Sequence, residues 1–244
     1  MRANAFISDL DTQRFGFNVA KINEFNHFTP EEILNNLRLN DVRLVISRVS
    51  SSNVLLINQL EYLGFEIKDI QVSYKHSLRL QDIIKIDQKV SIRDYKDDDL
   101  PHLKRIAYDS FYGYGHYARN SKLNKSKCAE IYSDWVERCS TDKKIADQLF
   151  VLVDKFQTAI GFFALKMNSK QNFAEGLIGA VDSRHRGQGL WKLIVNASII
   201  WAKEKGAKYW MTKVLIDNYP SHFAMIFNNC YIRTSEVTMH KWID

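Results

Sequence analysis

The residues best suited to do chemistry lie between 180 and 190, in the sequence AVDSRHRGQGL. Gly187 and Gly189 allow the backbone to adopt positive φ angles and to approach a ligand closely. Two arginines and a histidine, at 184–186, add positive charge. Backbone N–H groups that lead into a helix bind phosphate oxygens, and the helix dipole strengthens the attraction. We therefore expect a ligand that carries phosphate at this loop.

Two familiar phosphate-binding loops do not fit these residues. The loop lacks the Lys-Ser/Thr pair of a P-loop, and it is too short for one. It also lacks the third glycine of the dinucleotide-binding fingerprint. These residues therefore form neither a P-loop nor a dinucleotide-binding loop.

Hydrophobic patterning places this loop between a strand at 173–181 and a long helix at 190–205, which Gly206 closes. On either side of this strand, loop and helix, the patterning predicts further elements. We expect strands at 90–93, 150–154, 158–167, 209–214 and 235–242, and helices that begin at 97, 125 and 218. Adjacent strands mixed with helices predict an α/β protein with a central mixed sheet.

The first 88 residues read as a smaller set of alternating elements. Thr29-Pro30-Glu31-Glu32 is a helix start, with Thr as N-cap, and the helix runs to about residue 39. A strand at 42–49 follows, then a helix that ends at Gly64, then a strand at 70–80 with Val72, Tyr74 and His76 on one face.

Two segments of the chain have similar sequence patterns. The strands at 43–49 and 208–214 are related by an offset of 165, and the same offset places Asn53 on Asn218. We expect a strand–helix–strand unit that occurs twice, with coincidence between two common patterns as the alternative. The sequence thus predicts domains at 1–88 and 89–244, and only the second has the glycine loop.

Arg184, Gly187 and Gly189 fill the RxxGxG pattern of the GNAT superfamily of acyl-CoA-dependent N-acyltransferases, which residues 90–244 resemble. An unrelated glycine turn is the alternative. The resemblance implies a GNAT fold and acyl-CoA as co-substrate, and it makes the first domain a truncated GNAT-like half. It implies that the CoA pyrophosphate lies on the backbone of Arg184, His185, Arg186, Gly187, Gln188, Gly189 and Leu190.

The same resemblance assigns the rest of the acyl-CoA site. Pantetheine would pair with the backbone from Gly179 to Val181, where two parallel strands splay apart, and Asn218 would hold the acyl-CoA near its thioester. The small residues Gly176 and Gly179 would leave room for an acyl chain longer than acetyl, such as hydroxybutyryl.

Attack by an amine on a thioester requires a group that accepts the amine proton. Phe173-Ala174-Glu175 resembles the strand that carries the glutamate base of histone-type GNAT enzymes, so we expect Glu175 in this role. Burial would raise its pKa. The alternatives are a solvent-facing glutamate and an amine that loses its proton unaided.

The leaving thiolate requires a proton donor, which many GNAT enzymes supply as a tyrosine in the last helix. Here Ile226 occupies that position, and Cys230 occupies the position of the glycine that follows it. Tyr219 and His222 are the substitutes we expect, with surface or packing roles as the alternative.

Leu10 to Gly16 looks like the WDSxFFG opening of the dTDP-amino-sugar acetyltransferases, with Leu10 and Arg14 as departures. This resemblance implies an acceptor amine on a nucleotide-linked deoxy sugar and a role in surface polysaccharide synthesis. The aromatic segment 108–119 lies where GNAT enzymes bind acceptors, so we expect thymine stacking and phosphate pairing from Tyr112, Tyr114, His116, Tyr117 and Arg119. Part of this segment, Tyr108 and Phe111 above all, fits a helix end in the core equally well.

Composition excludes several other classes. The chain has 244 residues, 45% hydrophobic and 25% charged, which is typical of a globular protein. The net charge of +6 comes without a run of five Lys or Arg residues, so we expect no nucleic acid partner. The longest apolar run is too short for a membrane helix, and the acids near the N-terminus do not fit a signal peptide, which predicts a cytoplasmic protein. Three cysteines without a CxxC pair predict no metal site.

Two other functions stay open at this point: a GNAT enzyme that acylates a protein amine or a polyamine, and a non-catalytic CoA-binding module. The acyl group, the C3′ or C4′ position of the acceptor amine and the oligomeric state are also open.

Overall fold

The computed structural model describes residues 5–25, 29–78 and 90–243. Contacts divide the chain into two compact units. Unit 1 comprises residues 1–71, 115–127 and 234–244, and unit 2 comprises residues 72–114 and 128–233. The domain boundary expected at 88/89 lies outside the described residues, so the two-domain assignment stays a prediction.

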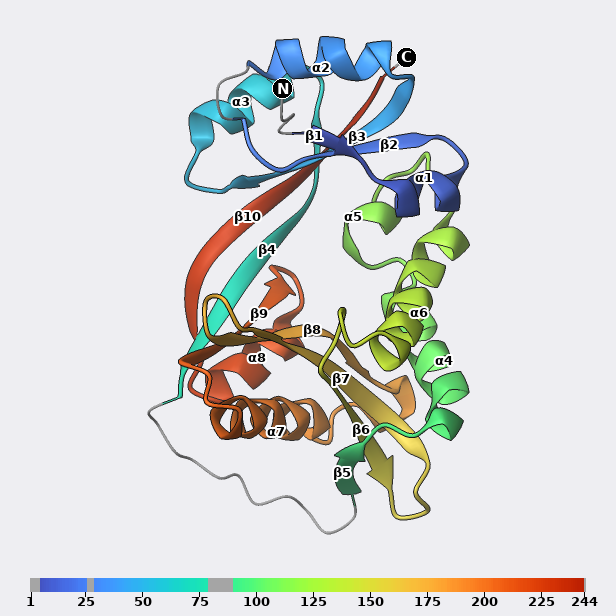
Figure 1. Cartoon of the computed structure of the whole chain (residues 1–244), viewed down its shortest axis with the longest axis vertical. Helices are drawn as coiled ribbons and strands as arrows, with labels where there is room; N and C mark the ends of the chain where they lie inside the picture. Colours follow the sequence, from blue (N-terminus) through green and yellow to red (C-terminus); the bar gives the residue numbers. More distant parts are fainter. Residues whose placement is uncertain (1–4, 26–28, 79–89, 244) are drawn as a thin grey trace. The chain divides into compact units, whose positions relative to one another are not determined.

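Unit 2 is built on a mixed sheet with the strand order β4-β9-β8-β7-β6-β5, as the α/β prediction requires (Figure 1). Its strands are the end of β4 (Glu66–Ser77), β5 (Val90–Asp94), β6 (Gln148–Asp154), β7 (Ala159–Asn168), β8 (Phe173–Val181) and β9 (Tyr209–Leu215). Strands β5 to β8 pair antiparallel, whereas β8 and β9 pair parallel.

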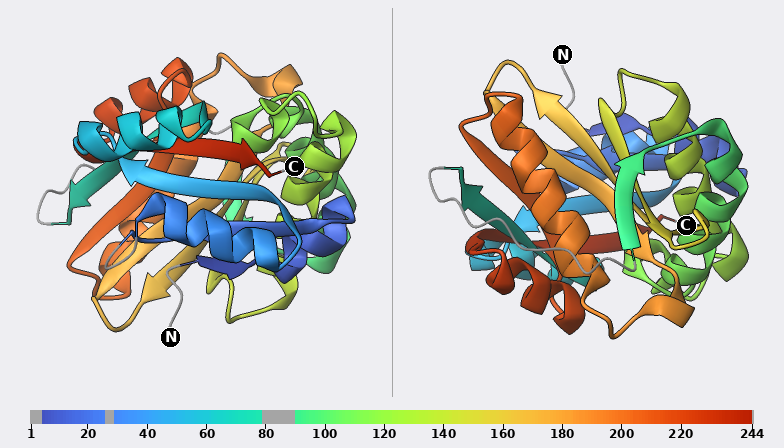
Figure 2. Two further views of the ribbon diagram at one scale, coloured as in Figure 1. Left: turned by 90° about the horizontal axis from the view of Figure 1, so that it is seen from above. Right: turned by 90° about the horizontal axis from the view of Figure 1, so that it is seen from below.

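Helices cover this sheet on both faces. They are α4 (Leu100–Phe111), which follows a 3-10 turn at Asp97–Asp99, α6 (Lys125–Thr141), α7 (Leu190–Glu204) and α8 (Tyr219–Phe227). Phe163 packs in one buried cluster with residues of α7 and α8, while its neighbour Phe162 packs in a second cluster with residues of α4 and α6. Figure 2 shows α7 lying over the strands. The period-2 alternation of β7 therefore fixes which helices lie on which face.

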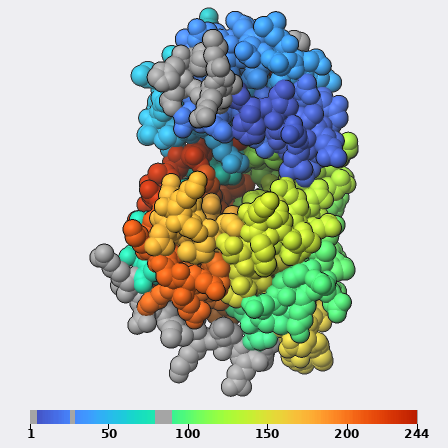
Figure 3. All heavy atoms as spheres, viewed as in Figure 1, coloured from blue at the N-terminus to red at the C-terminus, as the bar shows by residue number. Residues whose placement is uncertain are grey.

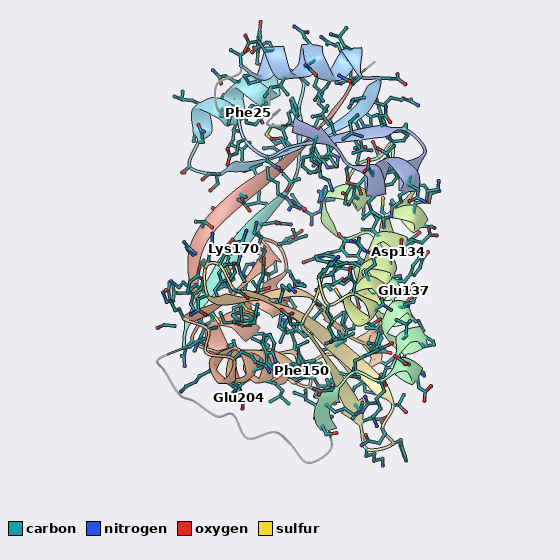
Figure 4. All side chains as sticks on the ribbon, viewed as in Figure 1. Phe25, Asp134, Glu137, Phe150, Lys170 and Glu204 are labelled. Atoms are coloured by element: carbon teal, nitrogen blue, oxygen red, sulfur yellow. The ribbon has the colours of Figure 1, made fainter. Side chains whose placement is uncertain are left out.

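The atoms of α4 and α6 form one continuous green surface in Figure 3. Lys104 of α4 forms an ion pair with Glu137 of α6, which is labelled in Figure 4. On the opposite side of the sheet, Phe150 packs against the cluster that contains α7.

The strands of unit 1 follow the order β1-β2-β3-β10, next to which lies the first part of β4. Its elements are β1 (Ala5–Ile7), α1 (Asp9–Phe15), β2 (Asn18–Ile22), α2 (Pro30–Leu39), β3 (Val42–Ser50), α3 (Val54–Tyr62), α5 (Gly115–Ala118) and most of β10 (Tyr231–Trp242). The capping box between Thr29 and Glu32 is formed as expected. The strand expected at 70–80 begins earlier, at Glu66, and its last two residues lie outside the described part of the chain.

The expected repeat of a strand–helix–strand unit is confirmed. One copy is β3-α3-β4 and the other is β9-α8-β10. Asn53 and Asn218 cap their helices with nearly the same backbone angles, φ −90° and −87°, and each side chain accepts from a backbone N–H three residues on. At the same offset, Gly64 and Asn229 both have positive φ, 82° and 55°. The two copies therefore share both helix ends.

Within the described residues, no helix is both long enough and apolar enough to cross a membrane.

Candidate functional site

The two loop glycines are required by their backbone angles. Gly187 and Gly189 have φ of 78° and 75°. A Cβ atom added at either position would meet no atom within 4 Å. The glycines are thus needed for the left-handed conformation, which costs other residues energy, and the space above them is open.

Asp182 holds the start of the loop through the hydrogen bonds that its carboxylate accepts. Its carboxylate is 2% exposed and accepts from the backbone N–H of Arg184 at 3.0 Å, from the Arg184 guanidinium at 2.8 and 3.0 Å, and from Arg105 of α4 at 2.6 Å. The bonds from Arg184, then those from Arg105, hold the Asp182 pKa well below its usual range. The charge of Arg184 is therefore partly neutralised within the loop, and its guanidinium orders the backbone.

Arg186 fixes the other side of the loop. Its Nε donates to the carbonyl of Val181 at 3.1 Å, and its terminal nitrogen donates to Ser110 Oγ at 2.9 Å. The loop ends at Gly189, the N-cap of α7, whose missing side chain leaves the first amides of the helix uncapped. A rigid set of N–H groups with open space before it is suited to hold phosphate oxygens.

The splay between β8 and β9 begins beside the expected base. The two strands pair at Ala174↔Trp210, Glu175↔Met211 and Gly176↔Thr212, and the pairing ends there. Strand β8 nevertheless runs on to Val181 and β9 to Leu215. The unpaired edge of β8 can therefore accept a ligand strand.

Gly176 and Gly179 do not provide room for a longer acyl chain on the side where their Cβ atoms would lie. A Cβ at Gly176 would collide with the Phe163 ring. At Gly179 it would lie 2.6 Å from Phe163 and 2.7 Å from Trp191. These glycines are present because aromatic rings pack directly on the strand.

Glu175 is half-buried on β8, opposite Lys166 of β7 and Met211 of β9. Burial raises the pKa of its carboxyl group, and Lys213 opposes part of this shift. A carboxylate with a raised pKa is a stronger base at neutral pH.

Asn218 and Tyr114 lie together in unit 2, although sequence patterns assign them to different ligands. Asn218 caps α8 through its Oδ1, and its Nδ2 donates to the Tyr114 hydroxyl at 2.8 Å. Phe111 packs against the Tyr114 ring at 5.6 Å and stacks on Tyr132 at 4.3 Å. Tyr112 is half-exposed beside them, at 52%.

His222 lies on α8 and is bound on both ring nitrogens. Its Nε2 lies 3.0 Å from the carbonyl oxygen of Leu215 and 3.1 Å from that of Ile216, and its Nδ1 lies 2.7 Å from the hydroxyl of Tyr74. Tyr74 is almost fully buried on β4. The sequence pattern placed Tyr74 only on one strand face with Val72 and His76, and no local signal links it to His222.

Tyr219 and Ile226 are both exposed on α8, at 66% and 61%. Tyr219 directly follows the capping Asn218, so its phenol is accessible at the start of the helix.

The other expected acceptor residues lie in unit 1 and are held by internal contacts. His116 Nδ1 lies 2.8 Å from His240 Nε2, and the Tyr117 hydroxyl donates to buried Asp11 at 2.9 Å. Arg119 donates to the carbonyl of Lys68 at 3.4 Å. Asp11 belongs to the Leu10–Gly16 motif, which thus joins this segment within unit 1.

The family model of the GNAT acetyltransferases matches residues 102–225, just over half of the chain. The chain belongs to the GNAT family. Members of this family use acetyl-CoA or another acyl-CoA, which fits the phosphate-binding character of the loop. No curated protein sequence matches this chain.

Solved structures of other GNAT proteins share the fold. A GCN5-related N-acetyltransferase from Sphaerobacter thermophilus has a TM-score of 0.65 at 11% identity, covering 98% of this chain and 76% of its own. A tandem GNAT protein from the clavulanic acid biosynthesis pathway has a TM-score of 0.63 at 13% identity, covering 92% and 75%. A glucosamine N-acetyltransferase region of a fungal multi-domain β-N-acetylglucosaminidase has a TM-score of 0.60 at 11% identity, covering 97% and 31%.

Among the described residues, no group of three or more His, Cys, Asp or Glu side chains could hold a metal ion.

Proposed function

We propose that this GNAT enzyme transfers an acyl group from acyl-CoA to the amino group of a dTDP-linked amino-deoxy sugar, for surface polysaccharide synthesis in the cytoplasm. The observation that carries the catalytic part is the position of Glu175, which is half-buried at the point where β8 and β9 cease to pair. A base beside the splay can reach the reacting groups of both substrates.

The loop would bind the pyrophosphate of acyl-CoA through the N–H groups of residues 184–190. Asp182 and Arg105 would hold these groups in place before the ligand arrives. The edge of β8 from Gly179 to Val181 that does not pair with β9 would pair with pantetheine, and Asn218 would lie near the thioester.

Bound acyl-CoA supplies a thioester carbonyl for attack. Glu175 would accept a proton from the acceptor amine, directly or through water. The amine nitrogen then forms a bond to the carbonyl carbon, the carbon–sulfur bond breaks, and the sulfur leaves as a thiolate that takes up a proton.

Tyr219 is the proton donor that the contacts favour over His222. The Nε2 of His222 faces two carbonyl oxygens, which only accept hydrogen bonds, so its proton is already engaged. The exposed phenol of Tyr219 has room to reach a ligand.

The sugar acceptor is supported by the Leu10–Gly16 resemblance and by the aromatic residues Tyr112 and Tyr114 in unit 2. Similarity of fold to a glucosamine N-acetyltransferase region agrees with an amino-sugar acceptor. The truncated GNAT-like nature of residues 1–88 is supported by the shared helix ends of the two strand–helix–strand copies.

Competition by dTDP tests the acceptor. dTDP alone should inhibit competitively against the sugar acceptor and should not compete with acyl-CoA. If dTDP fails to inhibit while a lysine peptide or a polyamine is acylated efficiently, the acceptor is not a nucleotide sugar.

A further inference from the structure

Unit 1 contains a surface cavity of about 560 Å³. None of the residues that line it is among those assigned above to the acyl-CoA, catalytic or acceptor sites. Its volume lies within the range of about 300–1,000 Å³ that is usual for small-molecule sites. Six of the side chains around it decide its chemistry: Phe17, Arg38, Asp41, Arg43, Lys122 and Trp242.

Two aromatic rings form the apolar part of the wall. The rings of Phe17 and Trp242 lie 5.3 Å apart and are tilted by 53°. Trp242 Nε1 donates to Oδ1 of Asn120. Asn120 is 2% exposed, and its Nδ2 donates to Nδ1 of His240. A partly buried hydrogen bond therefore holds the Trp242 ring before any ligand binds.

Three cations surround the rings. The Arg43 guanidinium lies 5.3 Å from the centre of the Phe17 ring, and Lys122 Nζ lies 5.4 Å from the centre of the Trp242 ring. Arg38 completes the set. In the described part of the chain, none of these three side chains forms an ion pair with a carboxylate within 4.0 Å. Arg43 and Lys122 lie over the rings, whereas Arg38 donates to the side chain of Asn35 at 3.1 Å. None of the three charges is neutralised by an ion pair of this kind, so the set remains available to an anion.

The charges around the cavity define the ligand. Three cations and the carboxylate of Asp41 leave a surplus of two positive charges. A phosphate monoester carries about −1.5 to −2 at neutral pH, which balances this surplus. The rings suit a planar base, because aromatic side chains stack on nucleobases, and Asp41 can accept from an N–H or O–H group.

We propose that this cavity binds a nucleoside monophosphate, either free or as part of a larger conjugate. The phosphate lies among Arg38, Arg43 and Lys122, and the base lies against Phe17 and Trp242. The inference is independent of the acceptor proposed above, because it concerns a site formed within unit 1 alone.

Calorimetry on the full chain tests the proposal. UMP and dTMP are titrated in the presence of saturating CoA, so that the acyl-CoA site cannot bind them, and a nucleotide-linked sugar and inorganic phosphate are titrated in parallel. We expect one nucleotide per chain, with affinity that falls as salt rises. If UMP or dTMP binds more tightly than the nucleotide-linked sugar, the ligand is a free nucleotide. If the nucleotide-linked sugar binds more tightly, the ligand is a conjugate.

Arg43→Ala and Lys122→Ala should each weaken nucleotide binding by about tenfold or more, the usual loss for a charged hydrogen bond. The matched control is Lys155→Ala, because Lys155 lies 4.8 Å from the Phe156 ring on a turn of unit 2. Circular dichroism checks that each variant is folded, and Arg43→Lys, which keeps the charge, should retain part of the affinity.

Three results would overturn the proposal. One is the absence of binding by any nucleotide at millimolar concentration. Another is inorganic phosphate binding as tightly as UMP, since the rings would then contribute nothing. The third is an equal loss of affinity in the Lys155→Ala control.

Discussion

The Tyr74 hydroxyl lies 2.7 Å from Nδ1 of His222, a residue 148 positions away in the sequence. Carbonyl oxygens only accept, so the proton on His222 must lie on Nε2, which faces the carbonyls of Leu215 and Ile216. In the neutral tautomer that carries this proton, Nδ1 accepts from the Tyr74 hydroxyl. This pair ties the end of β9 and the start of α8 to β4.

Removal of either member of this pair should lower stability. Tyr74→Phe removes this hydrogen bond and should cost about 1 kcal/mol, whereas His222→Ala also removes the contacts of Nε2 with two carbonyl oxygens and should cost about 1–3 kcal/mol. Urea unfolding of both single variants and the double variant measures the coupling. Strictly additive losses would show that the hydrogen bond contributes nothing.

Glu175→Gln should remove the acidic limb of the pH–rate profile. The raised pKa means that the carboxyl group of the native enzyme is protonated at low pH, and that activity rises as pH increases through this pKa. The variant should lose about 10²–10⁴-fold in kcat, the usual contribution of a general base. Activity within about twofold of the native enzyme at pH 8 would make Glu175 structural.

Tyr219→Phe should lower kcat, because the variant lacks the hydroxyl that would donate the proton to the leaving thiolate. His222→Gln serves as the comparison, with its effect confined to stability. The reverse pattern, in which His222→Gln alone lowers kcat, would assign the proton donor to His222.

Gly189→Ala should weaken CoA binding without unfolding the protein. The side chain meets no atom, so its effect comes from a φ of 75°, at a cost of about 1–2 kcal/mol. Gly206→Ala is the matched control, since Gly206 has a φ of 73° at the other end of α7. Equal CoA affinity in the two variants would contradict a role of the loop backbone in binding.

Asp182→Asn should raise the KM for acyl-CoA and reduce stability at neutral pH. The native pKa lies below the ordinary value of 3.8, so the stabilisation by Arg184 and Arg105 is complete above about pH 5 and is lost as pH falls through the native pKa. The difference in Tm between the two proteins should therefore shrink from pH 7 to pH 2. A constant difference would show that the charge of Asp182 is irrelevant.

Local sequence signals predicted the elements whose ends are marked by capping residues or by glycines. Gly187 and Gly189 marked the loop, Thr29 and Glu32 marked a capped helix, and Asn53 and Asn218 marked a repeated unit, because caps and positive φ angles depend on neighbouring residues.

Other features depend on contacts that are distant in the sequence. The short elements α1, β1 and β2 have weak patterns, and β2 is placed by parallel pairing with β3. The bond from Arg105 to Asp182 joins positions 77 residues apart. No periodicity reveals such contacts, and the packing of Phe163 against Gly176 and Gly179 likewise required the register of β7 and β8.

Thiol release is the measurement that most directly tests transfer from acyl-CoA to a nucleotide-linked amino sugar. The full chain is supplied with acetyl-CoA or longer acyl-CoAs, together with dTDP-linked 3-amino or 4-amino sugars, a lysine peptide or a polyamine. We expect free CoA thiol to appear only when an acyl-CoA and a dTDP-amino sugar are both present, and to fall with Glu175→Gln. Rapid release with the peptide or polyamine and none with any dTDP-amino sugar would contradict the proposed function.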